Sequence, residues 1–282
     1  MSRPSRRRAL RAAAVTLLAA AAACLTVPAQ AADPTYRCSE VSAANPQGSM
    51  WGEVLYGDLV ADGECALLYS RITGDVTVPP GSSLTTTLTT VTGTLRTAGP
   101  VTAERLRVHG DLALEAPGTA QVSLTDSWVA GAASGSVGSL LLARATVMGP
   151  LEVTTVDAAR LRTSVVGGTA TVRGGRLLVH DSLVRGSLAS TAATDALVCR
   201  SEVRGDLLLT GVQGWSRLGQ ERTEVCRTTV GGSVRLVDNP HSVVLGDLAV
   251  GGDLVCTGNT GPQGVVRTAG LTVAGASTGQ CA

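Results

Sequence analysis

One short phrase recurs along most of this chain, and it constrains the possible folds more than any other feature. Between Asp181 and Leu188 the phrase reads charged residue, Ser, any residue, Val, any residue, Gly, any residue, Leu. Its glycine stands at eleven positions spaced 17 to 27 residues apart: Gly57, Gly74, Gly93, Gly110, Gly131, Gly149, Gly167, Gly186, Gly205, Gly232 and Gly252. A repeat of this period is typical of solenoids, in which each unit stacks on its neighbours.

The residues on both sides of the glycine indicate β-structure. The residue two after it is Leu or Val in nine of the eleven copies, and the residue two before it is always aliphatic. These preceding residues are Leu55, Ile72, Val91, Val108, Val129, Val147, Val165, Val184, Val203, Val230 and Val250. Because residues two apart share one face of a strand, each copy predicts a strand, a glycine bend and a second strand.

Stacked copies of this unit predict an all-β fold, a single-domain right-handed parallel β-helix (β-solenoid) of about 11 rungs. A β-sandwich is the alternative, but it would not keep Val and Gly in phase through so many repeats. The repeats place the β-helix at residues 57–255. An N-terminal cap at 32–56 and a C-terminal cap at 256–282 would cover its ends, because an open end exposes unpaired backbone groups.

Residues 1–31 are typical of a signal peptide for export. Five arginines precede an apolar run, and Ala29-Gln30-Ala31 fits a cleavage site. The pair Arg6-Arg7 leaves the general and the twin-arginine routes both open, and Cys24 leaves a lipoprotein anchor as a minor alternative. We expect a secreted protein, extracellular or at the surface of the cell envelope, with no later stretch long enough to span a membrane.

Without the signal peptide the chain is acidic. Removing it takes away five arginines and no acidic residue, which leaves 18 arginines against 22 acidic residues, a formal charge of −4. Nucleic acid is therefore not an expected partner. The absence of lysine and the abundance of Ala, Gly, Arg and Val suggest a high-GC genome of actinobacterial type.

Six cysteines follow the signal peptide, and an even number in an exported protein predicts disulfide bonds. Fifteen pairings are possible. We favour Cys38–Cys65, Cys199–Cys226 and Cys256–Cys281, because one or two solenoid turns return the chain to its own neighbourhood. The first and third bonds would secure the caps. A zinc site is the alternative, but a CxxC motif and a nearby pair of histidines are both missing; we expect no metal and no cofactor.

Charged residues stand five positions before many of the glycines and would form an outward-facing ladder. They are Arg105, Asp126, Arg144, Arg162, Asp181, Arg200, Arg227 and Asp247. The ladder could bind an anionic polymer, but its alternating signs favour mutual neutralisation. One position further on, hydroxyl residues are predicted to face inward and to bond to the backbone: Ser127, Thr163, Ser182, Ser201 and Thr228.

The best candidate for a ligand site is Trp215 together with Arg217 and Glu221. These residues fall in the longest gap between glycines, where about eight extra residues should form an outward loop. The alternative is a loop tip packed on the side of the solenoid. Trp128 is the second possible platform for a sugar ring, since it is predicted to be exposed. Aspartates that follow glycine could bind calcium, but they also suit ordinary turns.

The end of the chain carries a resemblance to known proteins. The stretch Gly251 to Asn259, GGDLVCTGN, and the terminal Gly279-Gln280-Cys281 resemble uncharacterised secreted actinobacterial proteins that share this pattern. The Gly-Asp-Leu repeats also resemble those of bactofilins and other right-handed parallel β-helices. The resemblance implies this fold over about residues 57–281 and implies no activity. Bactofilins are cytoplasmic and form polymers, and they lack such a signal and such cysteines, so they imply the fold alone.

These features predict a secreted, non-enzymatic structural or surface-interaction module. The expected partner is a cell-wall or extracellular polysaccharide, or another surface protein. A monomer is favoured because secured caps oppose end-to-end growth, and a self-assembling filament is the alternative. The alternative from another class is a polysaccharide lyase or hydrolase on a β-helix scaffold. A hydrolase would need two facing carboxylates, whereas the glutamates here are scattered among the repeats.

Overall fold

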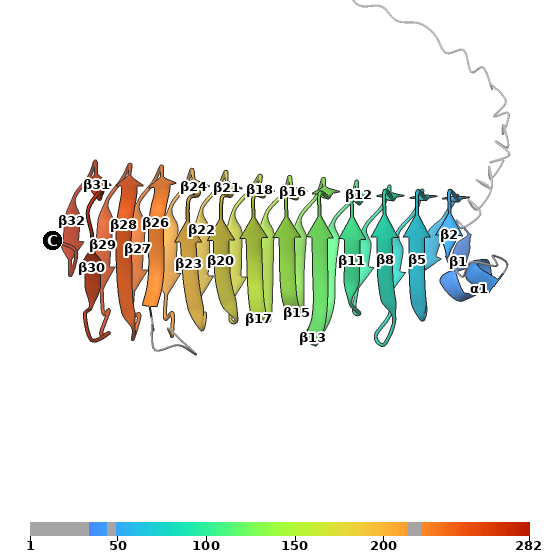
Figure 1. Cartoon of the computed structure of the whole chain (residues 1–282), viewed down its shortest axis with the longest axis horizontal. Helices are drawn as coiled ribbons and strands as arrows, with labels where there is room; N and C mark the ends of the chain where they lie inside the picture. The colour runs from blue at the N-terminus through green and yellow to red at the C-terminus, as the bar shows by residue number, and fades with distance from the viewer. Residues whose placement is uncertain (1–33, 44–48, 214–221) are drawn as a thin grey trace, which may run out of the picture. The chain divides into compact units, whose positions relative to one another are not determined.

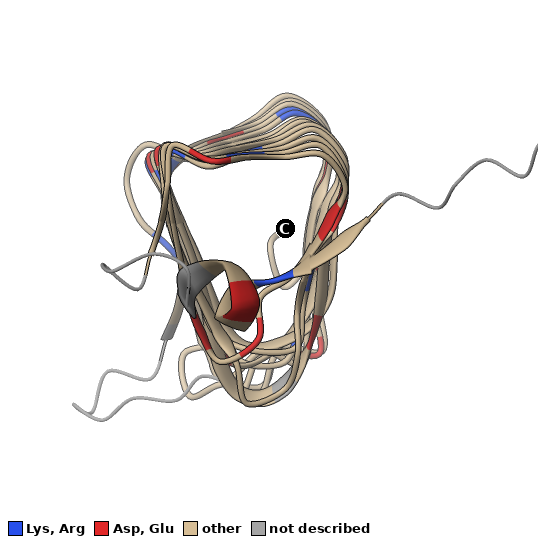
Figure 2. Ribbon diagram, turned by 90° about the vertical axis from the view of Figure 1, so that its right-hand side faces the viewer, with Lys and Arg blue, Asp and Glu red and all other residues tan. Residues whose placement is uncertain are grey.

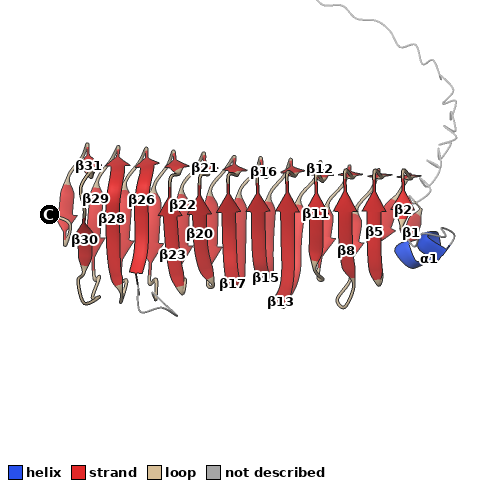
Figure 3. Cartoon of the chain, in the orientation of Figure 1, coloured by secondary structure: helices blue, strands red, loops and turns tan. Residues whose placement is uncertain are grey.

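The computed structural model of the protein describes residues 34–43, 49–213 and 222–282. Residues 33–282 form one compact unit, and this unit is a parallel β-solenoid of about 12 turns; 59% of the described residues are in strands and 2% in a helix. Its turns follow one another from the N-terminal to the C-terminal end in chain order (Figures 1 and 3). The predicted all-β solenoid is confirmed.

Each turn has three sides, and Figure 2 shows the resulting three-cornered cross-section. We call the side with two-residue strands the short-strand side. Its strands are β3 (Val54–Leu55), β6 (Arg71–Ile72), β9 (Thr90–Val91), β12 (Arg107–Val108), β14 (Trp128–Val129), β16 (Thr146–Val147), β18 (Val165–Val166), β21 (Leu183–Val184), β24 (Glu202–Val203) and β31 (Thr272–Val273). In two later turns this side is formed by the ends of the longer strands β26 (Arg222–Val230) and β28 (Ser242–Val250).

The first long side follows the glycine of each turn. Its strands are β1 (Thr35–Arg37), β4 (Asp58–Val60), β7 (Val76–Val78), β10 (Leu95–Thr97), β19 (Ala170–Arg173), β22 (Leu188–Thr191), β25 (Leu207–Thr210), β27 (Val234–Val237), β29 (Leu254–Thr257) and β32 (Ser277–Gly279). Three strands run on from this side into the next, namely β13 (Leu112–Thr125), β15 (Ala133–Ala143) and β17 (Leu151–Arg162).

The second long side precedes the corner that leads to the short strands. It contains β2 (Met50–Trp51), β5 (Glu64–Leu68), β8 (Ser83–Thr87), β11 (Val101–Glu104), β20 (Arg176–His180), β23 (Asp195–Cys199) and β30 (Val265–Arg267). The strands on all three sides pair in parallel with the same side of the neighbouring turn. The one helix among the described residues, α1 (Cys38–Ala43), lies at the N-terminal end (Figure 3).

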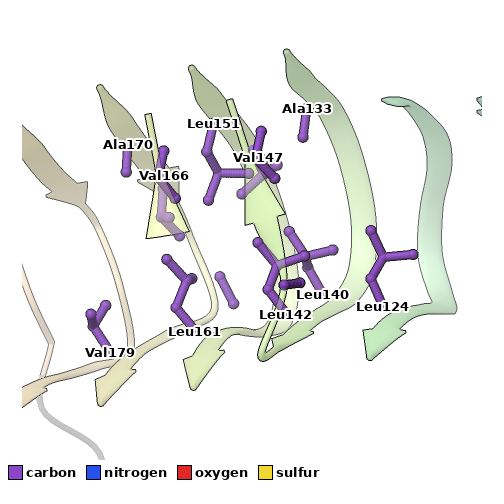
Figure 4. Packing of buried hydrophobic residues seen from close by; sticks show 14 of the residues in the cluster. Leu124, Ala133, Leu140, Leu142, Val147, Leu151, Leu161, Val166, Ala170 and Val179 are labelled. Atoms are coloured by element: carbon purple, nitrogen blue, oxygen red, sulfur yellow. The ribbon is translucent and has the colours of Figure 1, made fainter. Parts of the chain in front are cut away.

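The core is a set of aliphatic columns that run along the axis. Val147 lies between Val129 and Val166 of the adjacent short strands, and all three are at most 1% exposed. Figure 4 shows such columns, with Ala133, Leu151 and Ala170 on neighbouring turns. Burial of one such Val or Leu stabilises the fold by roughly 1.5–3 kcal/mol. The aliphatic positions of the repeat therefore form the core, as predicted.

The predicted register is wrong in one turn. Val166, not Val165, is the buried residue, and Val165 faces outward in line with Thr146. Likewise Gly168, not Gly167, continues the glycine ladder, since its N–H donates to the carbonyl of Gly149 at 3.2 Å. The doubled Val and doubled Gly fit either register in the sequence, and a slip of one residue exchanges the two faces of a strand.

This shift corrects two further predictions. Arg162 does not belong to the charged ladder, because Thr163 occupies that corner with φ of 53°. Thr163 is in turn not the inward hydroxyl of its turn, since Ser164 is 2% exposed and takes that place.

The solenoid extends beyond the predicted residues 57–255. In the first turn, β2 and β3 pair with β5 and β6. In the last turn, the Gly275 N–H donates to the Gly252 carbonyl at 3.0 Å and β30–β32 pair with β28 and β29. The last turn escaped detection because Ser277 stands where most repeats have Leu or Val.

All three predicted disulfides are present: Cys38–Cys65, Cys199–Cys226 and Cys256–Cys281. The first joins α1 to β5, and the third joins β29 to the end of the chain; their four cysteines are at most 2% exposed. The second joins two directly paired residues of β23 and β26. Two disulfides therefore hold the ends of the solenoid. Among the described residues, no helix is long and apolar enough to cross a membrane.

Asp62 contacts Ser39 at the start of α1, and this contact should be sensitive to acid. Its carboxylate accepts hydrogen bonds from the backbone N–H and the hydroxyl of Ser39, at 2.9 and 2.8 Å. These bonds, with one from Arg37, lower the pKa of Asp62 below its ordinary 3.8. The contact therefore stabilises α1 at every pH above that ordinary value and is lost as the pH falls through the lowered pKa.

We expect Asp62→Asn to speed hydrogen exchange of the Ser39 amide at neutral pH, because the substitution removes a charged acceptor. The difference between the variant and the natural protein should be constant above about pH 5 and should disappear in stronger acid. Asp157→Asn, at an exposed carboxylate of the same corner several turns further along the solenoid, is the control and should leave Ser39 exchange unchanged. Equal exchange rates of the Ser39 amide in Asp62→Asn and the natural protein at neutral pH would show that the Asp62 carboxylate does not stabilise the start of α1.

Candidate functional site

The repeated hydroxyl residues are structural. Ser127, Ser164, Ser182, Ser201 and Thr228 are 2–7% exposed, in the turn between the second long side and the short strands. Each hydroxyl donates to the carbonyl two residues before it, and the distances lie between 2.8 and 2.9 Å. Their hydrogen-bonding capacity is used within the fold, so they are not candidates for nucleophiles.

The aspartates that follow the glycines also serve the fold. Asp58 accepts a hydrogen bond from the backbone N–H of Asp75 at 2.8 Å, and Asp75 accepts one from Thr94 at 2.7 Å. The same bond links Asp111, Asp206 and Asp253 to the next turn. Each carboxylate thus satisfies a backbone donor of its neighbour, which is the turn role expected from the sequence.

The charged ladder lies at the corner before the short strands, where the chain takes a left-handed conformation. The corner residues have φ between +48° and +83°: Gly52, Tyr69, Leu88, Arg105, Asp126, Arg144, Thr163, Asp181, Arg200, Arg227, Asp247 and Gly270. Neighbouring ladder residues of opposite charge form ion pairs, as predicted: Asp126–Arg144, Asp181–Arg200 and Arg227–Asp247. The ladder as a whole is therefore mostly neutralised.

Exposed apolar side chains concentrate beside this corner. Seven large hydrophobic residues are exposed in the part of the chain that the structure describes, and six of them lie on the short-strand side or next to the corner that precedes it: Trp51, Val54, Tyr56, Tyr69, Leu88 and Met148. Only Val156 lies elsewhere. Together with half-buried Trp128, this side carries four of the six aromatic residues of the chain. This concentration makes the short-strand side the candidate interaction surface.

A groove of about 760 Å³ surrounds Trp128 on this side. Trp128 faces outward from β14 and lies directly between Arg107 of β12 and Thr146 of β16. The ring of His109 meets the Trp128 ring edge-on, with centroids 5.3 Å apart. Arg105 and Arg144 line the groove from the corner. Residues of the four short strands β9, β12, β14 and β16 line the groove. Strands of this side, among them β12 and β16, lie along the upper edge of Figure 1.

The groove carries excess positive charge. Arg105, Arg107 and Arg144 face one lining carboxylate, Asp126. Arg144 donates two hydrogen bonds to the Asp126 carboxylate, of 2.6 and 2.8 Å, and these bonds lower the pKa of Asp126. Within the described residues, Arg107 has no ion pair and no side-chain hydrogen bond, so its guanidinium can bind an anionic ligand.

Two aromatic rings form a second platform on the first two turns. The rings of Trp51 and Tyr69 are stacked, with centroids 6.2 Å apart and an angle of 25° between their planes. Their side chains are 60% and 55% exposed, and Tyr56, which directly follows β3, is 70% exposed. Sequence reasoning assigned Trp51 and Tyr56 to a cap and did not link Tyr69 to them. The three residues stand at different positions relative to the glycines, so the repeat did not indicate that they share one side.

Of the predicted site residues, Trp128 lies in the groove. Trp215, Arg217 and Glu221 lie outside the described residues. The sulfur atoms of Cys199 and Cys226 and a carboxylate oxygen of Glu224 lie within 4.8 Å of one another. Because the two sulfurs are bonded to each other, they are not thiolate ligands for a metal.

Comparison with known proteins leaves the fold and the groove as the basis for assigning a role. No protein-family model, no curated protein and no solved structure matches the chain.

Proposed function

We propose that the protein is a secreted, non-enzymatic binding module for an acidic extracellular polysaccharide, held in the Trp128 groove. The observation that carries this proposal is the pairing of an aromatic platform with an unpaired guanidinium. Trp128 and Arg107 are direct neighbours on adjacent strands, so an acidic glycan stacked on the indole would have a carboxylate beside Arg107. Aromatic rings supply apolar contact area, and Arg binds carboxylates through a planar fork.

The charges in the groove favour binding over hydrolysis. A glycosidase uses two carboxyl groups, one of which has a raised pKa and serves as the acid. Asp126 is the one carboxylate among the described lining residues, and its pKa is lowered by Arg144. An anionic Asp126 held by an arginine does not suit the role of the acid. We therefore retain a polysaccharide lyase or hydrolase only as the alternative from another class.

An extracellular place for the protein is supported by its covalent chemistry. Three disulfides bind the solenoid, and such bonds persist in oxidising compartments. The signal expected at residues 1–31 supports the same location. A stiff scaffold with one ligand-binding side also suits a binding role, because its rows of side chains are held in place by the stacked turns.

Titration of the protein with a polyuronate, followed by calorimetry at low salt, tests this proposal. We expect Trp128→Ala to weaken binding about five- to tenfold, because truncating an aromatic anchor commonly costs more than about 1 kcal/mol. Arg107→Ala should weaken it at least about tenfold through loss of a charge-assisted hydrogen bond. Added salt should weaken binding by the natural protein more than binding by Arg107→Ala.

Two matched variants serve as controls. Leu183→Ala shortens a half-buried side chain that faces outward from β21, in the same column as Trp128 but outside the groove. Arg235→Ala removes the same charge as Arg107→Ala from the first long side. Both controls should retain binding. Equal binding of a neutral glucan and the polyuronate, or of polyglutamate and the polyuronate, would contradict a site for acidic sugars.

A further inference from the structure

The outward column of the short strands contains two arginines that stand two turns apart. Successive strand pairings place Val54, Arg71, Thr90, Arg107 and Trp128 in one line along the axis. Arg71 and Arg107 are exposed, and within the described residues neither has an ion pair or a side-chain hydrogen bond. At the usual strand spacing they stand two turns, about 10 Å, apart.

This spacing matches one kind of ligand. The length of one pyranose unit in an extended glycan is close to the spacing of neighbouring strands. In a chain with twofold symmetry, alternate units face opposite ways, so a carboxylate points to the same side at every second unit. Two guanidiniums two turns apart can therefore bind two carboxylates of one chain, and the small Thr90 between them leaves room for the unit that faces away.

We propose that a linear glycan with a carboxylate on the same side at every second unit lies parallel to the solenoid axis, from the Trp128 groove to a second subsite on Trp51 and Tyr69. This inference rests on the proposed function and adds the direction, the length and the class of the ligand. Trp128 and the Tyr69 ring are three turns apart, about 14 Å, and Trp51 is one turn further. The described contacts thus cover about four to five sugar units.

The stacked Trp51–Tyr69 pair fits the outer end of this path. Both rings lie on the first two turns, beside the corner that leads to Val54 and Arg71. The apolar faces of the two rings would bind the last sugar ring by stacking, and this subsite would carry no charged side chain. Leu88, 38% exposed at the corner of the third turn, continues an apolar edge between the platform and the groove.

Calorimetric titration with oligouronates of two, four and six units tests the axial arrangement. We expect affinity to rise from two to four units and to change little beyond about five, because the path ends at Trp51. Arg71→Ala should weaken binding of the tetramer about fivefold and leave the dimer unchanged, since the dimer fits in the Trp128 groove. The double variant Trp51→Ala/Tyr69→Ala should weaken binding of the hexamer and leave binding of the dimer unchanged.

The outcomes separate this inference from the proposed function. If all lengths bind equally and Arg71→Ala has no effect, while Trp128→Ala still weakens binding, the ligand crosses the axis and the axial inference alone is overturned. If no oligouronate binds, the axial inference and the proposed function are both overturned. Arg235→Ala is the charge-matched control, and thermal melting of each variant shows whether the fold is intact; the exposed side chains of Arg71 and Trp51 make retention of the fold the expected result.

Discussion

Gly149→Ala is expected to destabilise the solenoid by about 3 kcal/mol, at the upper end of the cost of overpacking. A Cβ at this position would lie 2.7 Å from the carbonyl oxygen and 2.8 Å from the carbonyl carbon of Gly131 in the adjacent turn. Both contacts are with backbone, which cannot move aside without separating two paired turns. The Gly149 N–H also donates to that same carbonyl at 3.0 Å. Urea unfolding followed by circular dichroism measures the loss.

Gly211→Ala is the matched control. The nearest atom to an added Cβ there is 3.9 Å away, in Ala192 of the adjacent turn. Gly211 has φ of 62°, and Ala192 adopts φ of 53°, so the backbone at this corner already accepts an alanine. We expect a cost of at most about 1 kcal/mol for this substitution. Equal costs for Gly149→Ala and Gly211→Ala would show that close stacking of the glycines does not limit the stability of the solenoid.

Asn259→Ala is expected to destabilise the C-terminal turns by about 3 kcal/mol. Asn259 is 1% exposed, and its amide lies between Asn239 of the preceding turn and Gln280 of the following one. Its Oδ1 accepts from Asn239 at 2.7 Å, and its Nδ2 donates to the Leu236 carbonyl at 3.0 Å. Truncation would leave several of these buried groups unsatisfied, each at a cost of about 1–3 kcal/mol.

The neighbouring exposed Thr257 supplies the control, because Thr257→Ala removes no buried hydrogen bond. We expect that substitution to change the free energy of unfolding by less than about 0.5 kcal/mol. Hydrogen exchange of the Val212 amide gives a local measure, since this N–H donates to Asn239 at 2.9 Å and should exchange faster in Asn259→Ala. If Asn259→Ala costs no more than Thr257→Ala, the amide stack does not stabilise this end.

The sequence was sufficient for the fold wherever the repeat is regular. The alternation of Val147, Gly149 and Leu151 recurs in turn after turn, so the inward positions and the stacking direction follow from it. The three disulfides were predictable because solenoid turns bring residues 25 to 27 positions apart into contact. The buried hydroxyls were recognisable for the same reason, since Ser182 and Ser201 occupy one repeat position.

The sequence failed where a local pattern is ambiguous or unrepeated. Val165-Val166 and Gly167-Gly168 permit two registers, and only the pairing with the adjacent turns selects one. The candidate surface depends on residues that occur once each. Trp51, Tyr69 and Trp128 fall in different repeats at different positions, and their common side becomes evident only after the turns are stacked.

The proposed binding surface lies in the N-terminal half of the solenoid. Of the seven large hydrophobic residues that are exposed among the described residues, six lie within the first six turns, as do the unpaired Arg71 and Arg107. In later turns the corner carries the ion pairs Asp181–Arg200 and Arg227–Asp247. The N-terminal half would therefore bind the glycan, while the C-terminal half lengthens the scaffold.

The indole N–H signals of the three tryptophans offer the most direct test of the proposed binding surface. Each signal can be assigned in nuclear magnetic resonance spectra with single Trp→Phe variants, and the protein is then titrated with a uronate hexamer. We predict that the signals of Trp128 and Trp51 shift together in proportion to the bound fraction. A titration in which ligand binds, only Trp215 shifts, and Trp51 and Trp128 stay unchanged would contradict a binding site on the short-strand side.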